Sequence, residues 1–254
     1  MTRDAAFIEQ LDTLARNNRR RRLIERAGMD FSSNDYLGLA GSDRVRTIMA
    51  DAIAHGVPAG SGGSRLLRGN HYEHERLEAL AAHHYGSEAA LFFSTGYAAN
   101  SALFSTLPQS DDLVLYDALI HASAHEGMRL GRAECRPFAH NDMEALEGAC
   151  RAWRSAGTKG MIWIAVESLY SMDGDRAPIA ALDGLAREFG AWLIVDEAHA
   201  TGVFGPQGQG LSAEIGNAPH LITLRTCGKA LGVEGGLLCL PAVLRDFIVN
   251  RARG

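Results

Sequence analysis

The sequence predicts an α/β protein built on a mainly parallel sheet with helices on both faces. Short, continuous apolar runs recur along the chain, segments with helical apolar spacing separate most of them, and 28 glycines provide for tight turns. Short apolar runs that alternate with helices are typical of strands buried on both faces of a parallel sheet. The expected strands are residues 90–94, 112–117, 160–166, 191–195, 220–224 and 235–240.

The expected helices lie before and between these strands. An amphipathic pattern covers residues 3–22, and Ser42 is placed to cap a helix that stops before Gly56. Another helical pattern begins at His71 and is closed by Gly86. Further helices are expected at 97–107, 121–130, 142–155 with Asn141 as its cap, 179–189 and 241–252.

Two segments near the N-terminal end read as loops. Residues 32–41 hold turn-forming residues around a small apolar group, and residues 56–70 are too rich in glycine for regular structure. A loop as long as the second one in a compact domain is usually functional.

Composition excludes several classes of protein. A net charge of -5 argues against a nucleic-acid partner, because neutralising phosphates requires clustered basic residues. The basic cluster Arg19–Arg22 is read either as a solvated helix face or as an anion contact. No apolar run approaches the roughly 20 residues of a membrane span. The four cysteines show no paired spacing for a metal site or a disulfide framework. We therefore expect a cytoplasmic enzyme without a metal.

The letters DEAH, which begin at Asp196, raise the alternative of a helicase. Such an ATPase also requires the phosphate loop G-x-x-x-x-G-K-[ST] upstream of its acidic strand. Here the candidate Gly-Lys pair, which ends at Lys229, lies downstream and is followed by Ala230. The sequence also has no G-x-S-x-G elbow, no H-E-x-x-H motif and no strand followed by G-x-G-x-x-G. The sequence therefore excludes a DEAH helicase, and it lacks the motifs of a nucleophile-elbow hydrolase, an H-E-x-x-H metalloprotease and a dinucleotide-binding protein.

Polar residues gather after the expected strands. Ligands of open parallel sheets bind beyond the carboxyl ends of the strands. A lysine there, with an Asp nearby, suits a Schiff base with an aldehyde cofactor whose protonated ring nitrogen pairs with the Asp. Alone, Asp196 could be a helix cap, His121 a buried histidine and Lys229 a solvated loop lysine. Their shared position favours one site, with these members: Gly96, Tyr97, His121, Glu167, Ser171, Asp196, His199, Thr226 and Lys229.

Seven motifs in a fixed order resemble those of one family. They are SSNDYLGL, STGYAAN, HAS, FAHND, ESLYSMDGD, VDEAHATG and GKALG. Together they resemble the α-oxoamine synthases, which are pyridoxal 5'-phosphate enzymes of the aminotransferase-like superfamily. The resemblance runs from about residue 30 to the end of the sequence. It implies an aminotransferase-like, fold type I large domain at residues 41–254, preceded by an N-terminal helix and arm at 1–40.

The resemblance also implies roles for individual residues. Lys229 carries the cofactor as an internal aldimine and later moves the substrate α-proton, while Asp196 holds the pyridinium nitrogen. His199 contacts the phenolic oxygen of the cofactor, and His121 stacks on its ring. Gly96, Tyr97 and Thr226 help to position the phosphate, Glu167 and Ser171 line the cofactor pocket, and Asn34 lines the substrate pocket. The motif does not decide which of Arg19, Arg20, Arg21 and Arg22 contacts a substrate carboxylate.

The activity implied by the resemblance is an acyl transfer. An amino acid, alanine or glycine, condenses with an acyl-CoA or acyl-carrier-protein thioester and loses carbon dioxide to give an aminoketone. A homodimer is implied, with neither nucleic acid nor membrane as a partner. A glycine C-acetyltransferase-like enzyme, a long-chain synthase and a non-catalytic cofactor-binding remnant stay open as alternatives.

Two departures from the family pattern stand out. The family continues into a small C-terminal domain that supplies an arginine for the substrate carboxylate, so the sequence is expected to lack that domain. In addition, Arg225 and Cys227 stand near the lysine, where smaller or aromatic residues are frequent.

Overall fold

The computed structural model describes residues 3–25 and 27–253, which fall into two units that divide between Ser33 and Asn34. The first unit contains the helix α1 (Ala5–Arg16) followed by a segment without regular structure. The helix is therefore shorter than the expected residues 3–22. It ends because Asn18 adopts a left-handed conformation with φ of 55°, which stops a helix. The like charges of Arg19–Arg22 would also repel one another on a continued helix.

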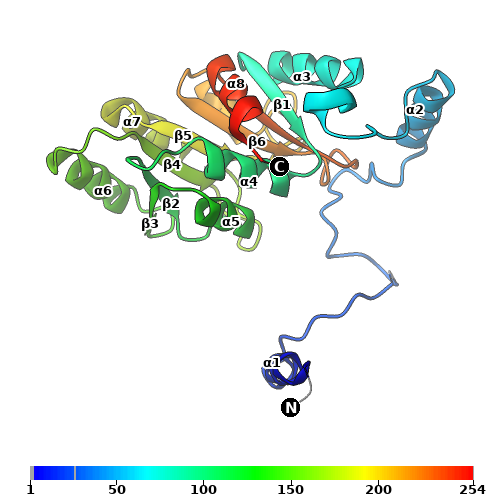
Figure 1. The fold of residues 1–254 in the computed structure, drawn as a ribbon, viewed down its shortest axis with the longest axis horizontal. Helices are drawn as coiled ribbons and strands as arrows, with labels where there is room; N and C mark the ends of the chain where they lie inside the picture. The colour runs from blue at the N-terminus through cyan, green and yellow to red at the C-terminus, as the bar shows by residue number, and fades with distance from the viewer. Residues whose placement is uncertain (1–2, 26, 254) are drawn as a thin grey trace. The chain divides into compact units, whose positions relative to one another are not determined.

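Within the described residues, the second unit is organised around a seven-stranded sheet of order β1-β7-β6-β5-β4-β2-β3. Strand β7 pairs antiparallel with β1 and β6, and all other neighbours pair in parallel (Figure 1). The expected mainly parallel sheet is therefore confirmed. Its strands are β1 (Ala89–Phe93), β2 (Leu113–Asp117), β3 (Glu134–Phe138), β4 (Ile162–Glu167), β5 (Trp192–Asp196), β6 (Leu221–Thr226) and β7 (Gly236–Leu240).

Strand β3 was not predicted from the sequence. Its residues ECRPF contain a proline and lack a continuous apolar run, so neither periodicity nor propensity indicates a strand. The strand lies at the edge of the sheet, beside β2 alone. Proline is tolerated at an edge because its missing N–H costs no ladder hydrogen bond there. Pairing with β2, a tertiary contact, therefore makes this segment a strand.

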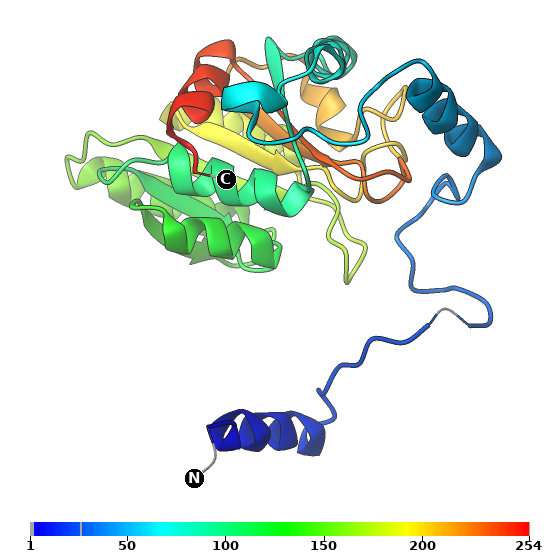
Figure 2. The same ribbon diagram turned by 45° about the vertical axis from the view of Figure 1, so that its right-hand side comes forward.

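Helices cover both faces of the sheet (Figure 2). One apolar core packs α4, α5 and α8 against the sheet, and a second core packs α6 and α7 against the opposite face. A third, smaller cluster joins α3 to β1 and β7. The remaining elements are α2 (Asp43–Ala54), η1 (Arg65–Gly69), α3 (Tyr72–Tyr85), α4 (Gly96–Thr106), α5 (Ala122–Leu130), α6 (Met143–Ser155), α7 (Ile179–Phe189), η2 (Leu211–Ile215) and α8 (Ala242–Arg251).

Local signals in the sequence set most helix ends. The Ser42 side chain accepts a hydrogen bond from the Val45 N–H at the start of α2, and Gly86 closes α3 in a left-handed conformation. Asn141, however, is not the cap of α6. Asp142 caps this helix by accepting from the Ala145 N–H at 2.9 Å, while Asn141 turns the chain just before it with φ of 54°.

The expected loop 56–70 contains regular structure. Its last residues form η1, a single π-helical turn that Ser64 caps. The Arg65 guanidinium lies 2.6 Å from the Glu78 carboxylate on α3, and it also donates to the Phe92 carbonyl on β1. These contacts attach the end of the loop to the domain, which glycine content alone could not indicate. Among the described residues, no helix has both the length and the apolar character that crossing a membrane requires.

The parallel strands bring the expected site residues to one edge. In the register of the sheet, Glu167 on β4 lies opposite Asp196 on β5, and Asp196 lies opposite Leu224 on β6. The chain segments that leave β4, β5 and β6 therefore start side by side.

Candidate functional site

A hydrogen-bonded series of four side chains lies beyond strands β5 and β6. The ε-amino nitrogen of Lys229 lies 2.7 Å from Nε2 of His199, and Nδ1 of His199 lies 2.6 Å from the Tyr36 hydroxyl. The Tyr36 hydroxyl also donates to the Asn34 side-chain oxygen at 3.1 Å. Lys229, His199 and Asn34 were predicted as site residues, whereas Tyr36 was not.

Burial controls the charge of this series. Desolvation lowers the pKa of the Lys229 amine, although Asp196 and Glu167 act in the opposite direction. Desolvation, together with the positive charges of Lys229 and His121, lowers the pKa of His199 to about 4. The imidazole of His199 is therefore neutral near pH 7, and one ring nitrogen can accept a proton or a hydrogen bond.

Asp196 places a carboxylate in the interior, at the end of β5. It is 6% exposed, and its oxygens accept from the Asn100 side chain and the Ala198 N–H, each at 2.9 Å. Burial nevertheless raises the pKa of Asp196, and the hydrogen bonds and Lys229 offset this effect only in part. A buried carboxylate with incomplete compensation favours a cation beside it. A protonated pyridine nitrogen meets this requirement.

Glu167 is the second buried carboxyl at this edge. Burial, followed by the negative charge of neighbouring Asp196, raises its pKa to about 8. Glu167 is therefore mostly protonated at neutral pH and can donate a hydrogen bond. Two buried acids with raised pKa values, side by side, are a feature of functional sites.

His121 is linked to Asp196 through two side chains. It caps α5, and its Nδ1 lies 2.8 Å from the Ser123 hydroxyl. One Asn100 amide group donates both to the Ser123 hydroxyl and to Asp196, at 2.9 Å each. This network fixes the His121 ring and the Asp196 carboxylate relative to each other.

The start of α4 forms an anion cradle beside β7. Thr95 caps the helix, so the backbone N–H groups of Gly96 and Tyr97 lie in its first turn, where a helix offers them no acceptor. A Cβ at Gly236 would lie 2.6 Å from the Gly96 nitrogen, and one at Gly96 would lie 3.3 Å from Thr226. Glycine at both positions therefore lets the cradle pack close to Thr226. The Tyr97 hydroxyl donates to Glu126, away from the backbone of the cradle.

The structure does not bring all predicted residues together. Ser171 lies exposed in the turn after β4. The arginines Arg19–Arg22 belong to the first unit, and they are exposed. The roles assigned to these residues, like the other residue roles, stay predictions.

Two residues of the network were missed by sequence reasoning. Tyr36 lies within the SSNDYLGL motif and Asn100 within STGYAAN, but neither stood out by type. Asn100 is 2% exposed among the buried residues Ala99 and Leu103 of α4. An amide on an otherwise apolar helix face was the available signal, because a buried polar group must have a partner.

This sheet, with a lysine, a buried Asp and a helix N-terminus at one edge, is typical of the cofactor-binding α/β class of proteins. The chain belongs to the aminotransferase class I and II family, whose model matches residues 26–254. Its sequence relatives include 8-amino-7-oxononanoate synthases. The protein of Emericella nidulans is 41% identical over 98% of this chain, and that of Burkholderia mallei strain SAVP1 is 45% identical over 90%. The chain spans 63% and 58% of the lengths of these two relatives.

Solved structures confirm the expected fold class. A serine palmitoyltransferase from S. paucimobilis with a bound PLP–myriocin aldimine matches with a TM-score of 0.86 and 26% identity. The match covers 99% of this chain and 68% of that one. An 8-amino-7-oxononanoate synthase from Francisella tularensis matches with a TM-score of 0.70 and 29% identity, over 87% of this chain and 61% of that one. The resemblance to the α-oxoamine synthases is thereby confirmed.

Proposed function

We propose that this chain carries the catalytic centre of a pyridoxal-phosphate-dependent acyltransferase like 8-amino-7-oxononanoate synthase. One observation carries the proposal: Lys229, His199 and Asp196 meet at the ends of two adjacent parallel strands. Lys159 is the sole other lysine of the sequence, and it lies with Asp111 and Asp112 around a different surface pocket. The sequence relatives at 41% and 45% identity support the choice within the family.

The residues present fit the cofactor. Asp196 offers a buried anion for its ring nitrogen, and the first turn of α4 offers N–H groups for its phosphate. Lys229 is the amine for its aldehyde, and the lowered pKa of this amine favours the nucleophilic, neutral form. When bound, the cofactor supplies an electron sink for the α-carbon of an amino acid.

The other residues hold the reacting groups and move protons. His199 would contact the phenolic oxygen of the bound cofactor, and His121 would contact its ring face. The Lys229 nitrogen takes the α-proton of the substrate, and His199 Nε2, 2.7 Å away, orients the amine for that step. Glu167 would line the cofactor pocket and Asn34 the substrate pocket, whereas a pocket role for Ser171 rests on the family resemblance alone.

The reaction proposed here joins alanine or glycine to an acyl thioester. The bond from the α-carbon to the thioester carbonyl forms, the carbon–sulfur bond breaks with release of the thiol, and the amino-acid carboxylate leaves as carbon dioxide. With alanine and a pimeloyl thioester the product is 8-amino-7-oxononanoate, an intermediate of biotin synthesis.

A long-chain synthase is the second candidate. The TM-score of 0.86 to serine palmitoyltransferase favours it, although that identity is only 26%. A glycine C-acetyltransferase-like enzyme and a non-catalytic cofactor-binding protein remain further alternatives, and a cytoplasmic location stays a prediction.

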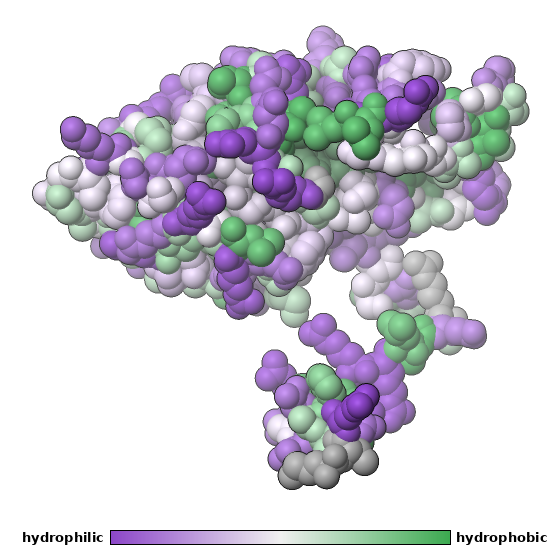
Figure 3. Space-filling model, in the orientation of Figure 1, coloured by the Kyte–Doolittle hydropathy of each residue, from purple (hydrophilic) through white to green (hydrophobic). Residues whose placement is uncertain are grey.

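A homodimer is the proposed assembly. Exposed apolar side chains lie on α2 and on η1, and Figure 3 shows separate apolar areas on this face of the molecule. Large exposed apolar side chains of this kind are typical of a protein–protein interface. Light scattering should give twice the chain mass of 27.3 kDa, and Leu66→Asp with Leu67→Asp should restore the single mass. The residues concerned are Ile48, Met49, Ile53, Leu66 and Leu67.

Mass spectrometry of the product tests the proposed function. The chain is incubated with pyridoxal phosphate and each of three pairs: alanine with pimeloyl-CoA, glycine with acetyl-CoA, and serine with palmitoyl-CoA. We expect 8-amino-7-oxononanoate from the first pair and none from the Lys229→Ala variant. A product from the serine pair alone would assign the long-chain alternative. Cofactor absorbance without any product would indicate a non-catalytic protein.

A further inference from the structure

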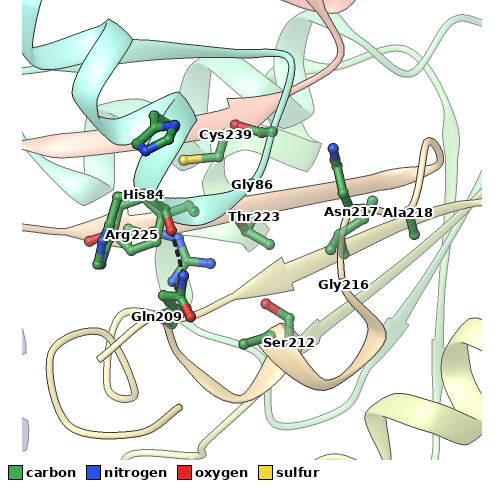
Figure 4. A pocket seen from close by; sticks show the side chains of 15 residues that line it. His84, Gly86, Gln209, Ser212, Gly216, Asn217, Ala218, Thr223, Arg225 and Cys239 are labelled. Atoms are coloured by element: carbon green, nitrogen blue, oxygen red, sulfur yellow. Dashed lines mark hydrogen bonds between the residues drawn. The ribbon is translucent and has the colours of Figure 1, made fainter. Parts of the chain in front are cut away.

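A second polar cavity lies on the face of the sheet that carries α3. It has a volume of about 170 Å³ and opens between the end of α3, the η2 turn and strands β6 and β7 (Figure 4). Its lining includes Arg225, Thr223 and Cys239 from the two strands. None of these residues belongs to the site described above, because Thr226 follows Arg225 on β6 and successive strand residues point to opposite faces.

Arg225 is the central charge of this cavity. The residue is 2% exposed, and its guanidinium carbon lies 3.9 Å from the centre of the Tyr85 ring. Nη1 donates to the Gln209 carbonyl (Figure 4), with a longer contact of 3.5 Å to the Thr201 hydroxyl. Nε is buried and has no hydrogen-bond partner among the residues that the structure describes. The guanidinium is thus held in place with part of its donor capacity unused.

Among the described residues, no carboxylate oxygen lies within 4.0 Å of a nitrogen of the Arg225 guanidinium, which is the limit for an ion pair. Glu197 is the nearby candidate, but its oxygens accept from the Ser168 hydroxyl at 2.6 Å and from the N–H groups of Leu211 and Ser212 at 3.1 and 2.6 Å. Among the described residues that line the cavity, none is Asp or Glu. Glu197 Oε2 and Arg225 Nη1 lie 2.4 and 2.9 Å from the position that a Cβ on Gly210 would take, so this carboxylate is near the guanidinium without forming an ion pair. An anionic ligand in direct contact would further offset the cost of burying the Arg225 charge.

We propose that this cavity is a binding site for a small oxyanion, a carboxylate or a phosphate group. The planar guanidinium matches the two oxygens of either group, and the pair gains strength in a water-poor site. The hydroxyls of Ser212 and Thr223 and the amide of Asn217 lie on the lining and can donate to the remaining oxygens. The volume of about 170 Å³ admits a small anion with a few waters.

Calorimetric titration of the cofactor-saturated chain with inorganic phosphate and with acetate tests the proposal. Saturating pyridoxal phosphate keeps the cradle at α4 filled, so phosphate binding there does not contribute. We expect saturable binding of one anion per chain, weakened at least about tenfold in Arg225→Gln, because a charge-assisted hydrogen bond is lost. Tighter binding of acetate would assign a carboxylate ligand, and tighter binding of phosphate a phosphate group.

Two further variants keep the result independent of folding. Asn217 is exposed at the cavity, so Asn217→Ala should fold normally and bind the anion several-fold more weakly. Arg245→Gln and Asn250→Ala on α8 are the matched controls, and both should bind like the parent chain. The proposal would be overturned if the parent chain showed no saturable binding. It would also be overturned if Arg225→Gln and Asn217→Ala both bound the anion with the affinity of the parent chain. Cofactor absorbance in the same samples reports the proposed function separately.

Discussion

The Lys229 amine and the His199 imidazole form a direct hydrogen bond, with 2.7 Å between Nζ and Nε2. The low pKa of His199, about 4, keeps this imidazole neutral, so Nε2 can accept from the lysine without adding a charge. The amine is thus oriented before any substrate arrives. Orientation of a nucleophile by a neighbouring group is part of its activation.

Lys229 should be the sole point of covalent attachment. Reduction with borohydride in the presence of pyridoxal phosphate should place one label on the peptide that contains Lys229, because its amine is buried near Asp196 and has a lowered pKa. Peptide mapping by mass spectrometry measures this. Lys159→Arg is the control and should be labelled as fully as the parent chain. A label on Lys159 instead would disprove the assignment.

Asp196→Asn should retain the cofactor but lose most carbanion chemistry. A neutral amide cannot keep the ring nitrogen protonated, and removal of a major electrostatic term typically costs about a hundredfold or more in rate. Exchange of the α-proton of alanine in deuterated buffer gives this rate by NMR. The exposed Asp246→Asn on α8 is the control. Near-normal exchange in the Asp196 variant would mean that Asp196 does not serve the ring.

Tyr36→Phe should weaken the site moderately. It removes the hydroxyl that lies 2.6 Å from His199 Nδ1, a hydrogen bond worth about 0.5–1.5 kcal/mol. We expect α-proton exchange to slow by roughly 2- to 10-fold, with cofactor absorbance retained. Tyr72→Phe on α3 is the matched control and should leave the rate unchanged. A full-rate Tyr36 variant would show that the hydroxyl does not orient His199.

A second histidine makes stability depend on pH. Nδ1 of His140 lies 2.8 Å from Asp117 and Nε2 lies 2.6 Å from Asp175. Burial by itself lowers the pKa of His140, but the two carboxylates outweigh it, and the pKa is raised above its ordinary 6.5. The folded state therefore binds this proton more tightly. The contribution to stability is full below about pH 6.5 and is lost as the pH rises through the folded-state pKa.

His140→Gln should therefore destabilise the protein more at acidic pH. We expect a loss of about 1–2 kcal/mol in the free energy of unfolding near pH 5.5 and a smaller loss near pH 8.5. Urea denaturation of the variant and the parent chain at both values measures the difference. His55→Gln, at the exposed end of α2, is the control. An equal loss at both values of pH would show that the charge of His140 is not involved.

The sequence by itself determined the fold class and indicated that Asp196, His199 and Lys229 would lie at the ends of neighbouring strands. Apolar runs long enough for strands but too short for buried helices indicated six of the seven strands. The carboxyl ends of parallel strands lie at the same edge of a sheet. The positions of Asp196, His199 and Lys229 then followed from chain order alone. Ser42 and Gly86 set their helix ends through local hydrogen bonding and backbone conformation, which depend on neighbouring residues only.

The tertiary structure decided what depends on distant residues. Strand β3 exists because β2 pairs with it, and Asp142 rather than Asn141 caps α6 because Asn141 is used to hold Asp175. Tyr36 and His199 are 163 positions apart, so no local pattern could reveal their hydrogen bond. The same holds for the Arg225 cavity, whose walls come from α3, η2, β6 and β7. Burial and partner geometry arise when remote segments pack, and periodicity along the chain carries no record of them.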